Sequence, residues 1–348
     1  MAIKASGALS MQSDIVDEFG GTAPHAVSEY YRGGSNVPDV AGNNTIGTSG
    51  LIAFGNFYNC LNEILQALSN STNVDLSSIF GSDWTTSVPK RCTIAAGVTI
   101  GGTGGTAAIT VPSNMGGTLS IVITGSVIGT GGSAGGAGGD AISNAASGVT
   151  LIIESGGLCA GGGGGGGTGG TGGGGQYSSS STSGPVYSWP YGTRYVWADH
   201  WYGSFNFVVW ANTFYYSSSS GNQSFAKSGS SPTYDNTYES RMYAVTRTVT
   251  STTNTSGGAG GSGGVGQGYN QSNTSGSAGA SGGTNAGAGG TGGSGNTYGL
   301  AGSTGGTGAN GNAGNGSAGA AGGAAGAALS GTAVTFTNNG TVHGTVAT

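Results

Sequence analysis

Few side chains in this sequence have the types and spacing that catalysis or metal binding requires. The three histidines lie in separate segments, without the spacing of a zinc motif, at His25, His200 and His343. Glu154 and Asp140 are the carboxylates that a glycosidase pair would use, but their separation does not follow from sequence. The glycine run at 161–175 lacks the Gly-Lys-Ser/Thr ending of a phosphate-binding loop. We therefore expect no catalytic, metal-binding or cofactor-binding residues.

Aromatic residues offer chemistry of another kind, since most of them fall in one segment between Gln176 and Ser256. Tyr and Trp provide rigid contact area with a polar group, which suits recognition of sugars or of outer-membrane protein loops. The candidate receptor-binding residues are Tyr187, Trp189, Tyr191, Tyr195, Trp197, Trp201, Tyr202, Tyr215 and Tyr216. The alternative is that these rings form the small core of the segment, because the flanking glycine blocks supply no large apolar side chains.

The elements that would carry this aromatic insert are unusual. Glycine fills 79 of the 348 positions, and from Gly276 onward much of it recurs every third residue, strictly so from Gly299 to Gly314. Three residues per turn is the period of the polyproline-II helix, and a glycine on every turn leaves a bare stripe for another backbone. We expect a packed bundle of such helices, in which valine at Gly305 or Gly308 would clash with a neighbour.

Composition disfavours the other fates of a glycine-rich segment. Residues 248–348 contain no charged side chain, and no proline follows Pro232. Collagen requires abundant proline, and disorder usually accompanies a high net charge. A packed bundle is therefore favoured over both.

Short β-branched runs separated by glycine occupy residues 92–160. The runs at 119–129 and 149–158 look like copies of one another, and a third copy stands at 334–344. Such repeats are typical of stacked β-coils, each of which buries its inner face against its neighbours. Since the third copy follows the glycine blocks, we expect the chain to return to the same stack. Within the insert, the alternation of Phe205, Phe207 and Val209 with other residues predicts one more strand.

The N-terminal residues 1–58 have an ordinary composition. Just after them, Leu61, Ile64, Leu65 and Leu68 follow an i, i+3, i+4, i+7 pattern, which predicts one amphipathic helix from Cys60 to Leu68.

Charge and cysteine content limit the function further. The net charge of -5 disfavours nucleic acid as a partner. The sequence shows neither a secretory signal nor a long apolar run, and its three widely spaced cysteines indicate a reducing compartment. A virus particle assembled in the cytoplasm of a host cell fits these features.

Several segments resemble those of tailed-bacteriophage virion proteins. Ser13–Gly21, Ser28–Gly34 and Thr48–Gly50 resemble the opening of such proteins, which in that family looks like a module that docks on the tail or baseplate. This resemblance implies the virion-attachment candidates Asp14, Glu18, Phe19, Glu29, Tyr30, Tyr31 and Arg32. Downstream, Ile109–Leu119, Gly161–Gly167 and Gly266–Tyr269 resemble phage tail fibre and fibre-tip proteins. T-even-like distal adhesins share the glycine-rich blocks, which in that family form a sandwich of polyglycine-II helices whose tip loops bind the host.

Together these features predict a mainly β and irregular fold: an N-terminal attachment module with one short helix, stacked short strands, and a polyglycine-II bundle that carries an aromatic β insert. We divide the chain into an attachment module at 1–91, β repeats leading into the first glycine block at 92–175, the insert at 176–256, and the second glycine block with a closing strand at 257–348.

The favoured function is that of a structural virion protein of a tailed phage, a tail fibre or tail-tip adhesin that mediates host attachment. Its expected partners are other tail, baseplate or fibre proteins at the N-terminal module, and a host polysaccharide or outer-membrane protein at the insert. A purely architectural tail, baseplate or capsid-decoration protein is the alternative, followed by an ice-binding protein and, last, an enzyme. Both a trimer, as in many fibres, and a monomer remain open.

Overall fold

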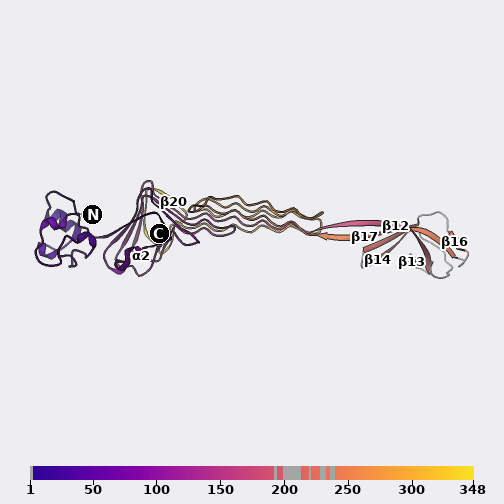
Figure 1. The fold of residues 1–348 in the computed structure, drawn as a ribbon, viewed down its shortest axis with the longest axis horizontal. Helices are drawn as coiled ribbons and strands as arrows, with labels where there is room; N and C mark the ends of the chain where they lie inside the picture. The colour runs from indigo at the N-terminus through magenta and orange to yellow at the C-terminus, as the bar shows by residue number, and fades with distance from the viewer. Residues whose placement is uncertain (1–2, 192–193, 199–212, 219–220, 228–232, 236–239) are drawn as a thin grey trace.

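The computed structural model describes residues 3–191, 194–198, 213–218, 221–227, 233–235 and 240–348. The molecule is elongated, with the N-terminal residues at one end and the strands of the insert at the other (Figure 1). Between them lie a stack of short strands and a long bundle of glycine-rich segments, and the C-terminus returns to the stack.

The N-terminal module has its own small core and only short helical turns. Its buried apolar residues run from Ile3 to Cys60. Within this core the Tyr30 ring meets the Phe57 ring edge-on, with 6.4 Å between their centroids. The helices are η1 (Met11–Val16), α1 (Asp17–Phe19), η2 (Val27–Glu29), η3 (Ala41–Asn43) and η4 (Phe54–Phe57). The expectation of one short helix in this module is therefore wrong: the chain makes several short helical pieces, of which η1 continues directly into α1 and ends before Gly20.

The strand stack consists of three parallel sheets that the chain visits in turn. The first sheet holds β1 (Ile64–Leu68), β4 (Lys90–Ile94), β7 (Leu119–Ile123), β10 (Val149–Ile153) and β19 (Thr335–Asn338). The second holds β2 (Ser71–Thr72), β5 (Thr99–Gly101), β8 (Ser126–Ile128), β11 (Leu158–Ala160) and β20 (Thr341–His343). The third holds β3 (Val74–Asp75), β6 (Ile109–Val111), β9 (Ile142–Asn144) and β18 (Leu329–Gly331). After β3 the chain forms the helices α2 (Leu76–Phe80) and η5 (Gly81–Thr85).

Alternation along each strand builds the core of the stack. In β7 and β10 every second residue is buried, and equivalent residues of successive coils lie in register, as Ile121 does with Leu151. Aliphatic side chains thus stack on one another inside the coil, and the glycine corners let the chain turn between sheets. The predicted return of the C-terminal strand is confirmed, because β19 pairs with β10 and β20 pairs with β11.

The helix predicted from Cys60 to Leu68 is wrong, since the structure has strand β1 at this position. Ile64 and Leu68 are buried, but Leu65 is 49% exposed. Residues four apart share a face both in a helix and in a strand, so these two positions fit either period. Pairing of β1 with β4 over five residues decides for the strand.

The glycine bundle grows out of one corner of the stack, the turn between the second and the third sheet. In the first coil this corner is the single residue Asn73, in the second it is 102–108, and in the third it is the hairpin 129–141. In the fourth coil the chain leaves after Ala160 and re-enters at Leu329. The bundle and the insert are therefore one very long corner loop.

Hydrogen bonds inside the bundle repeat every three residues. The segment 161–173 is central: Gly163, Gly166, Gly169 and Gly172 donate to one neighbouring segment, and Gly164, Gly167, Gly170 and Gly173 donate to another. It also accepts from the segments 287–299 and 317–326 and contacts both arms of the hairpin 129–141. Each of these segments lies against it with the same three-residue step.

Crowding explains the uninterrupted glycine run at 161–167. A Cβ on any of these seven residues would come within 3.0 Å of a backbone atom of a neighbouring segment. Gly162 and Gly165 face the hairpin at Thr130 and Ser133. The hairpin turns back at Gly135, and the next two positions of the same phase are the exposed Thr168 and Thr171.

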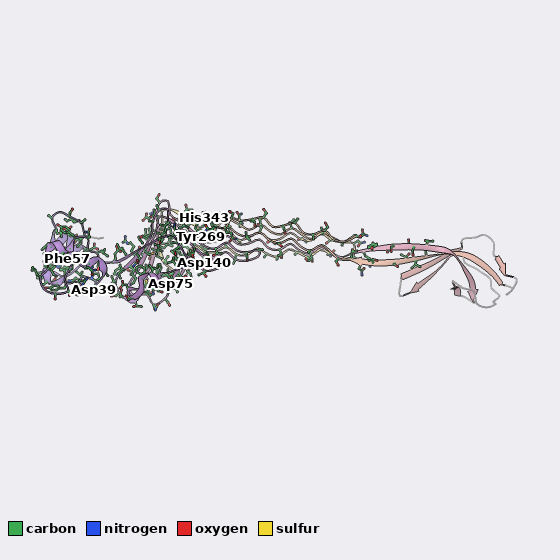
Figure 2. The ribbon with its side chains drawn as sticks, in the orientation of Figure 1. Asp39, Phe57, Asp75, Asp140, Tyr269 and His343 are labelled. Atoms are coloured by element: carbon green, nitrogen blue, oxygen red, sulfur yellow. The ribbon has the colours of Figure 1, made fainter. Side chains whose placement is uncertain are left out.

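Two tyrosines in the proximal turns anchor the bundle on the second sheet. The Tyr269 ring lies where a Cβ of Gly101 would be, so that this strand position accepts only glycine without displacing the ring. Tyr298 lies beside His343, with ring centroids 6.1 Å apart. Figure 2 shows Tyr269 and His343 together at the junction of stack and bundle.

The insert consists of antiparallel strands at the distal end of the bundle (Figure 1). Its strands are β12 (Gly175–Tyr191), β13 (Arg194–Ala198), β14 (Thr213–Ser218), β15 (Gly221–Lys227), β16 (Thr233–Asp235) and β17 (Ser240–Thr255). They lie in the order β13-β12-β17-β15-β14. β16 pairs with the first residues of β17, Ser240–Met242. The strand predicted around Phe205–Val209 lies outside the described residues. The prediction of a mainly β protein is confirmed. No helix within the described ranges is long and apolar enough to cross a membrane.

Candidate functional site

Most of the aromatic receptor candidates lie on three strands of the insert. Tyr187, Trp189 and Tyr191 stand at alternate positions of β12, Tyr195 and Trp197 are on β13, and Tyr215 and Tyr216 are on β14. Trp201 and Tyr202 lie outside the described residues.

The sheet register brings two of these strands together. Trp189 is opposite Val196, and Tyr195 and Trp197 are opposite the neighbouring residues Pro190 and Ser188. Five candidates thus lie on one antiparallel strand pair, where the alternation of the strands assigns the three positions of β12 to one face and the two of β13 to the other. β14 is separated from this pair by β15 and β17, so Tyr215 and Tyr216 lie across the sheet from the others.

A long polar ribbon connects this sheet with the bundle. From Gly175 to Ser183, β12 pairs only with β17, and twelve of the eighteen paired residues are serine or threonine. From Thr250 to Arg247, β17 pairs with β15 as well. The Thr182 and Thr248 hydroxyls are 3.2 Å apart. The exposed Tyr177 is the aromatic residue of this ribbon.

The virion-attachment candidates divide into buried and exposed residues. Phe19 and Tyr30 belong to the core of the N-terminal module, so their contribution is to its shape. Asp14 forms an ion pair with Lys4 (3.0 Å) and accepts a hydrogen bond from the Ser10 N–H. That N–H and then Lys4 hold the pKa of Asp14 below its ordinary value. Glu18 accepts from the Asn62 N–H, which ties the module to the start of the stack.

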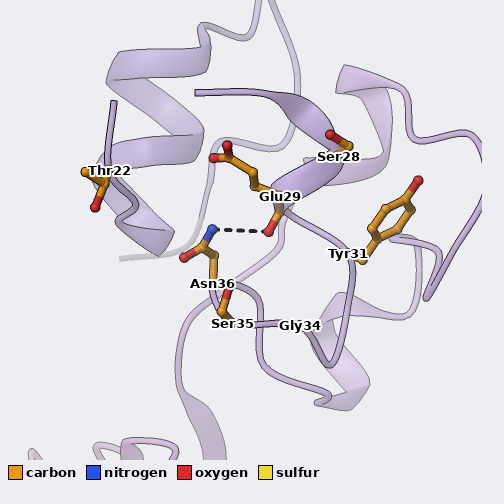
Figure 3. Close-up of a pocket in the computed structure, with 7 residues that line it drawn as sticks. All are labelled: Thr22, Ser28, Glu29, Tyr31, Gly34, Ser35 and Asn36. Atoms are coloured by element: carbon orange, nitrogen blue, oxygen red, sulfur yellow. Dashed lines mark hydrogen bonds between the residues drawn. The ribbon is translucent and has the colours of Figure 1, made fainter. Parts of the chain in front are cut away.

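The remaining candidates surround the loop from 28 to 36. Arg32 pairs with Asp39 through Nε, 3.2 Å from Oδ1, and the Tyr31 hydroxyl donates to the carbonyl oxygen of Gly50. Glu29 and Tyr31 line a surface groove of about 470 Å³ together with Thr22, Ser28, Gly34, Ser35 and Asn36 (Figure 3). Asn36 donates to the Glu29 carbonyl oxygen and closes one side of the groove. Sequence reasoning missed Ser35 and Asn36, whose polar types are common in any turn.

The charge of the N-terminal module is mainly negative. The two cations of residues 1–60, Lys4 and Arg32, are both paired with carboxylates. Within the described part of the chain no ion pair forms at Glu29, which is exposed at the groove. The groove therefore presents an uncompensated carboxylate among hydroxyl and amide groups.

Side chains that would suggest catalysis have structural neighbours instead. Asp140 accepts the Ala327 N–H at 2.7 Å, where the chain returns from the bundle. His25 lies 3.3 Å from the Tyr30 hydroxyl, and His343 lies against Tyr298. Over the described ranges no three His, Cys, Asp or Glu residues gather as a metal site would require.

The cysteines are single and buried. Burial raises the pKa of Cys92 and of Cys159 to about 12, and it raises the pKa of Cys60 as well. At neutral pH these thiols are therefore protonated and poorly reactive.

Comparison with known proteins identifies the family. Residues 62–244, more than half of the chain, match the family described as "Phage tail fibre adhesin Gp38". The chain is also similar to a solved structure, the crystal structure of the gp37-gp38 adhesin tip complex of the bacteriophage S16 long tail fiber. The two share 17% identity over 86% of this chain and 88% of that chain, with a TM-score of 0.36. No curated protein sequence shows a significant match.

The molecule is a virion component of a tailed phage, built to attach the particle to its host. The chain belongs to the Gp38 family of phage tail fibre adhesins. The matched region contains most of the stack, the start of the bundle and nearly all of the insert.

Proposed function

We propose that the aromatic insert at 176–256 makes the host contact of this adhesin, with a surface polysaccharide or an outer-membrane protein as its receptor. The observation that carries this proposal is the position of the insert, which forms the end of the molecule farthest from the N-terminal module (Figure 1). Its strands gather the candidates of β12 and β13 within one strand pair. Aromatic rings with polar groups at their edges suit both kinds of receptor.

Exchange of the insert between two such adhesins tests this assignment. A chain that carries a foreign insert between Gln176 and Ser256 should adsorb to the host of the donor phage, because the receptor contact moves with the insert. The measurement is the adsorption rate of otherwise identical particles on both hosts. A control chain receives the donor's N-terminal module instead. An unchanged host range of the insert chimaera would reject the proposal.

We further propose that the glycine segments are polyglycine-II helices and act as a stiff spacer. The three-residue repeat of the hydrogen bonds and the absence of large side chains between the segments support this assignment. Because neighbouring segments are bonded at every turn, bending would break many hydrogen bonds at once. The bundle then holds the insert at a fixed distance from the virion, and no catalytic step is needed for attachment.

The N-terminal part of the predicted module 1–91 is proposed to join the chain to another tail fibre protein. Its core is separate from that of the stack and lies at the opposite end from the insert. The groove beside Glu29 is the surface that we assign to this contact. The segments 92–175 and 257–348 then serve as scaffold, as the division by sequence anticipates.

A charge reversal in the groove tests the attachment surface. Glu29→Lys should lower the amount of this protein in purified particles, because a basic side chain would repel the cationic partner surface that the acidic groove suits. Asp17→Lys is the matched control, an exposed carboxylate of the same module outside the groove. Equal incorporation of the Glu29→Lys protein and the wild type, measured by immunoblot, would show that the groove is not the contact.

A further inference from the structure

The distal turns of the glycine bundle hold the strand on which the insert begins. Gln176 lies one residue after the start of β12, and its backbone N–H donates to Asn312 Oδ1 at 2.8 Å. The Asn312 Nδ2 donates back to the Gln176 carbonyl oxygen, also at 2.8 Å. One side-chain amide thus satisfies both backbone groups of Gln176, as a neighbouring strand would.

A second asparagine closes on the same carbonyl. Asn285 Nδ2 donates to the Gln176 carbonyl oxygen at 3.1 Å, and the Asn285 carbonyl oxygen accepts the Asn312 N–H at 3.0 Å. Asn285 has φ 61°, in the left-handed region that asparagine tolerates better than most residues. The two turns, 283–286 and 311–314, are therefore joined to each other and to β12.

The returning strand is held in the same place. Thr255 is the last residue of β17, and its hydroxyl donates to the Thr284 carbonyl oxygen at 2.7 Å. The Gln176 side chain reaches across the ribbon to Asn254 Oδ1 at 3.0 Å. Both strands of the ribbon are thus fixed to the bundle at the point where they leave it.

The same two turns also hold the adjoining backbone, because the Ala313 N–H donates to the Gly174 carbonyl oxygen and the Gly283 N–H to the Ser256 carbonyl oxygen. Beyond this attachment the first part of the ribbon has no packing of its own to set its direction. From Gln176 to Ser179 the ribbon has only two strands, with exposed side chains on β12, and it buries no apolar face; β15 joins β17 from Thr250 onward. A two-stranded hairpin of this kind is only marginally stable by itself. Its orientation must come from its attachment to the bundle.

We propose that Asn285 and Asn312 are positioning residues that fix the direction in which the ribbon leaves the bundle, so that the insert is presented along the long axis of the adhesin. This inference rests on the proposed function of the insert as the receptor contact. Preorganised orientation raises the fraction of encounters in which the receptor can be engaged.

The test combines a distance measurement with adsorption. Spin labels at Ser180→Cys on the ribbon and Thr307→Cys on the bundle occupy exposed positions, and the native cysteines can stay because all three are buried. The variant N285G/N312A removes both amides, and glycine retains the left-handed backbone at residue 285. Asn296→Ala is the matched control, since it removes side-chain hydrogen bonds from a turn at the opposite end of the bundle.

In the full-length protein we expect a broader distance distribution in N285G/N312A and an unchanged one in Asn296→Ala. Particles carrying N285G/N312A should adsorb about fivefold more slowly, while purified protein binds host cells as the wild type does. A distribution as narrow as that of the wild type would overturn the proposal, as would a broader one with unchanged adsorption. Weaker binding by the purified variant would also overturn it, because the asparagines would then act in the receptor contact itself.

A wrong assignment of the receptor contact can be told apart from a wrong role of the two asparagines. If the insert is not the receptor contact, the chimaera described above keeps its host range. The spin-label distances are measured without receptor and still report whether Asn285 and Asn312 hold the ribbon.

Discussion

Threonine in place of Gly165 is expected to unfold the base of the glycine bundle. Gly165 lies in the central segment, where its Cβ would come within 3.0 Å of the Ser133 carbonyl oxygen. Its own N–H donates to Gly136 and its carbonyl accepts from Gly323, so the backbone cannot move away without breaking bonds on other sides. We expect a loss of about 3 kcal/mol or more in the free energy of unfolding, measured by thermal or denaturant unfolding of the full chain.

Thr168→Gly is the matched control. Thr168 has the same phase in the same segment, one turn further on, and it is exposed where the hairpin 129–141 has ended. Its replacement adds backbone freedom to the unfolded chain and should cost about 1 kcal/mol or less. Gly305→Val, whose Cβ would meet the Thr168 carbonyl oxygen, should resemble Gly165→Thr. Equal melting temperatures for Gly165→Thr and the wild type would show that the central segment is not closely packed.

The contrast between these positions indicates what glycine spacing does and does not convey. A period of three predicts that one side of a segment is bare, and the hydrogen bonds between Gly302–Gly311 and its neighbours have this period. The unbroken run at 161–167 carries further information, since it marks a segment with neighbours on every side. The sequence places this run in the first glycine block but does not predict its central position, because the number of neighbours depends on where distant segments return.

The stack was easier to anticipate than its start. Copies such as 119–129 and 149–158 repeat both the strands and the glycine corner, so their parallel pairing follows from similarity alone. β1 lacks such a copy pattern, and its apolar residues Ile64 and Leu68 fit a helix as well as a strand. Only pairing with β4 distinguishes the two, and this pairing is a long-range property.

In the candidate sites too, the features that composition determines could be predicted, and the features that long-range contacts determine could not. Clustering of aromatic residues singled out the insert, because it needs only a count along the sequence. The contacts of Asn285, Asn312 and Tyr269 could not be predicted, since each is one residue in a glycine-rich turn. Their partners Gln176 and Gly101 are more than 100 residues away in the chain and come close only through the folding of the bundle.

Methionine in place of Lys90 is expected to destabilise the stack almost as strongly as Gly165→Thr destabilises the bundle. Lys90 begins β4 and is 1% exposed. Its ammonium group donates to the carbonyl oxygens of Thr86 (2.8 Å), Val88 (3.0 Å) and Gly116 (2.8 Å). It thereby joins the chain before β4 to the corner before β7. Lys90→Met leaves three carbonyls without this donor, and we expect the free energy of unfolding to fall by about 3 kcal/mol.

Arg91→Met provides the control on the same strand. Arg91 is exposed and pairs with Glu63 at 3.1 Å, a surface ion pair that contributes about 0.2–1 kcal/mol.

The dependence of the Lys90→Met effect on pH offers a second measurement. Burial lowers the pKa of Lys90, and the charge of Asp83 opposes this effect only in part. Because the folded pKa lies below the unfolded one, the unfolded chain binds more protons between the two values. The stability of the wild type relative to Lys90→Met should therefore rise as the pH approaches the ordinary lysine value of 10.5. A difference in the free energy of unfolding that does not change with pH would show that the ammonium group is in water.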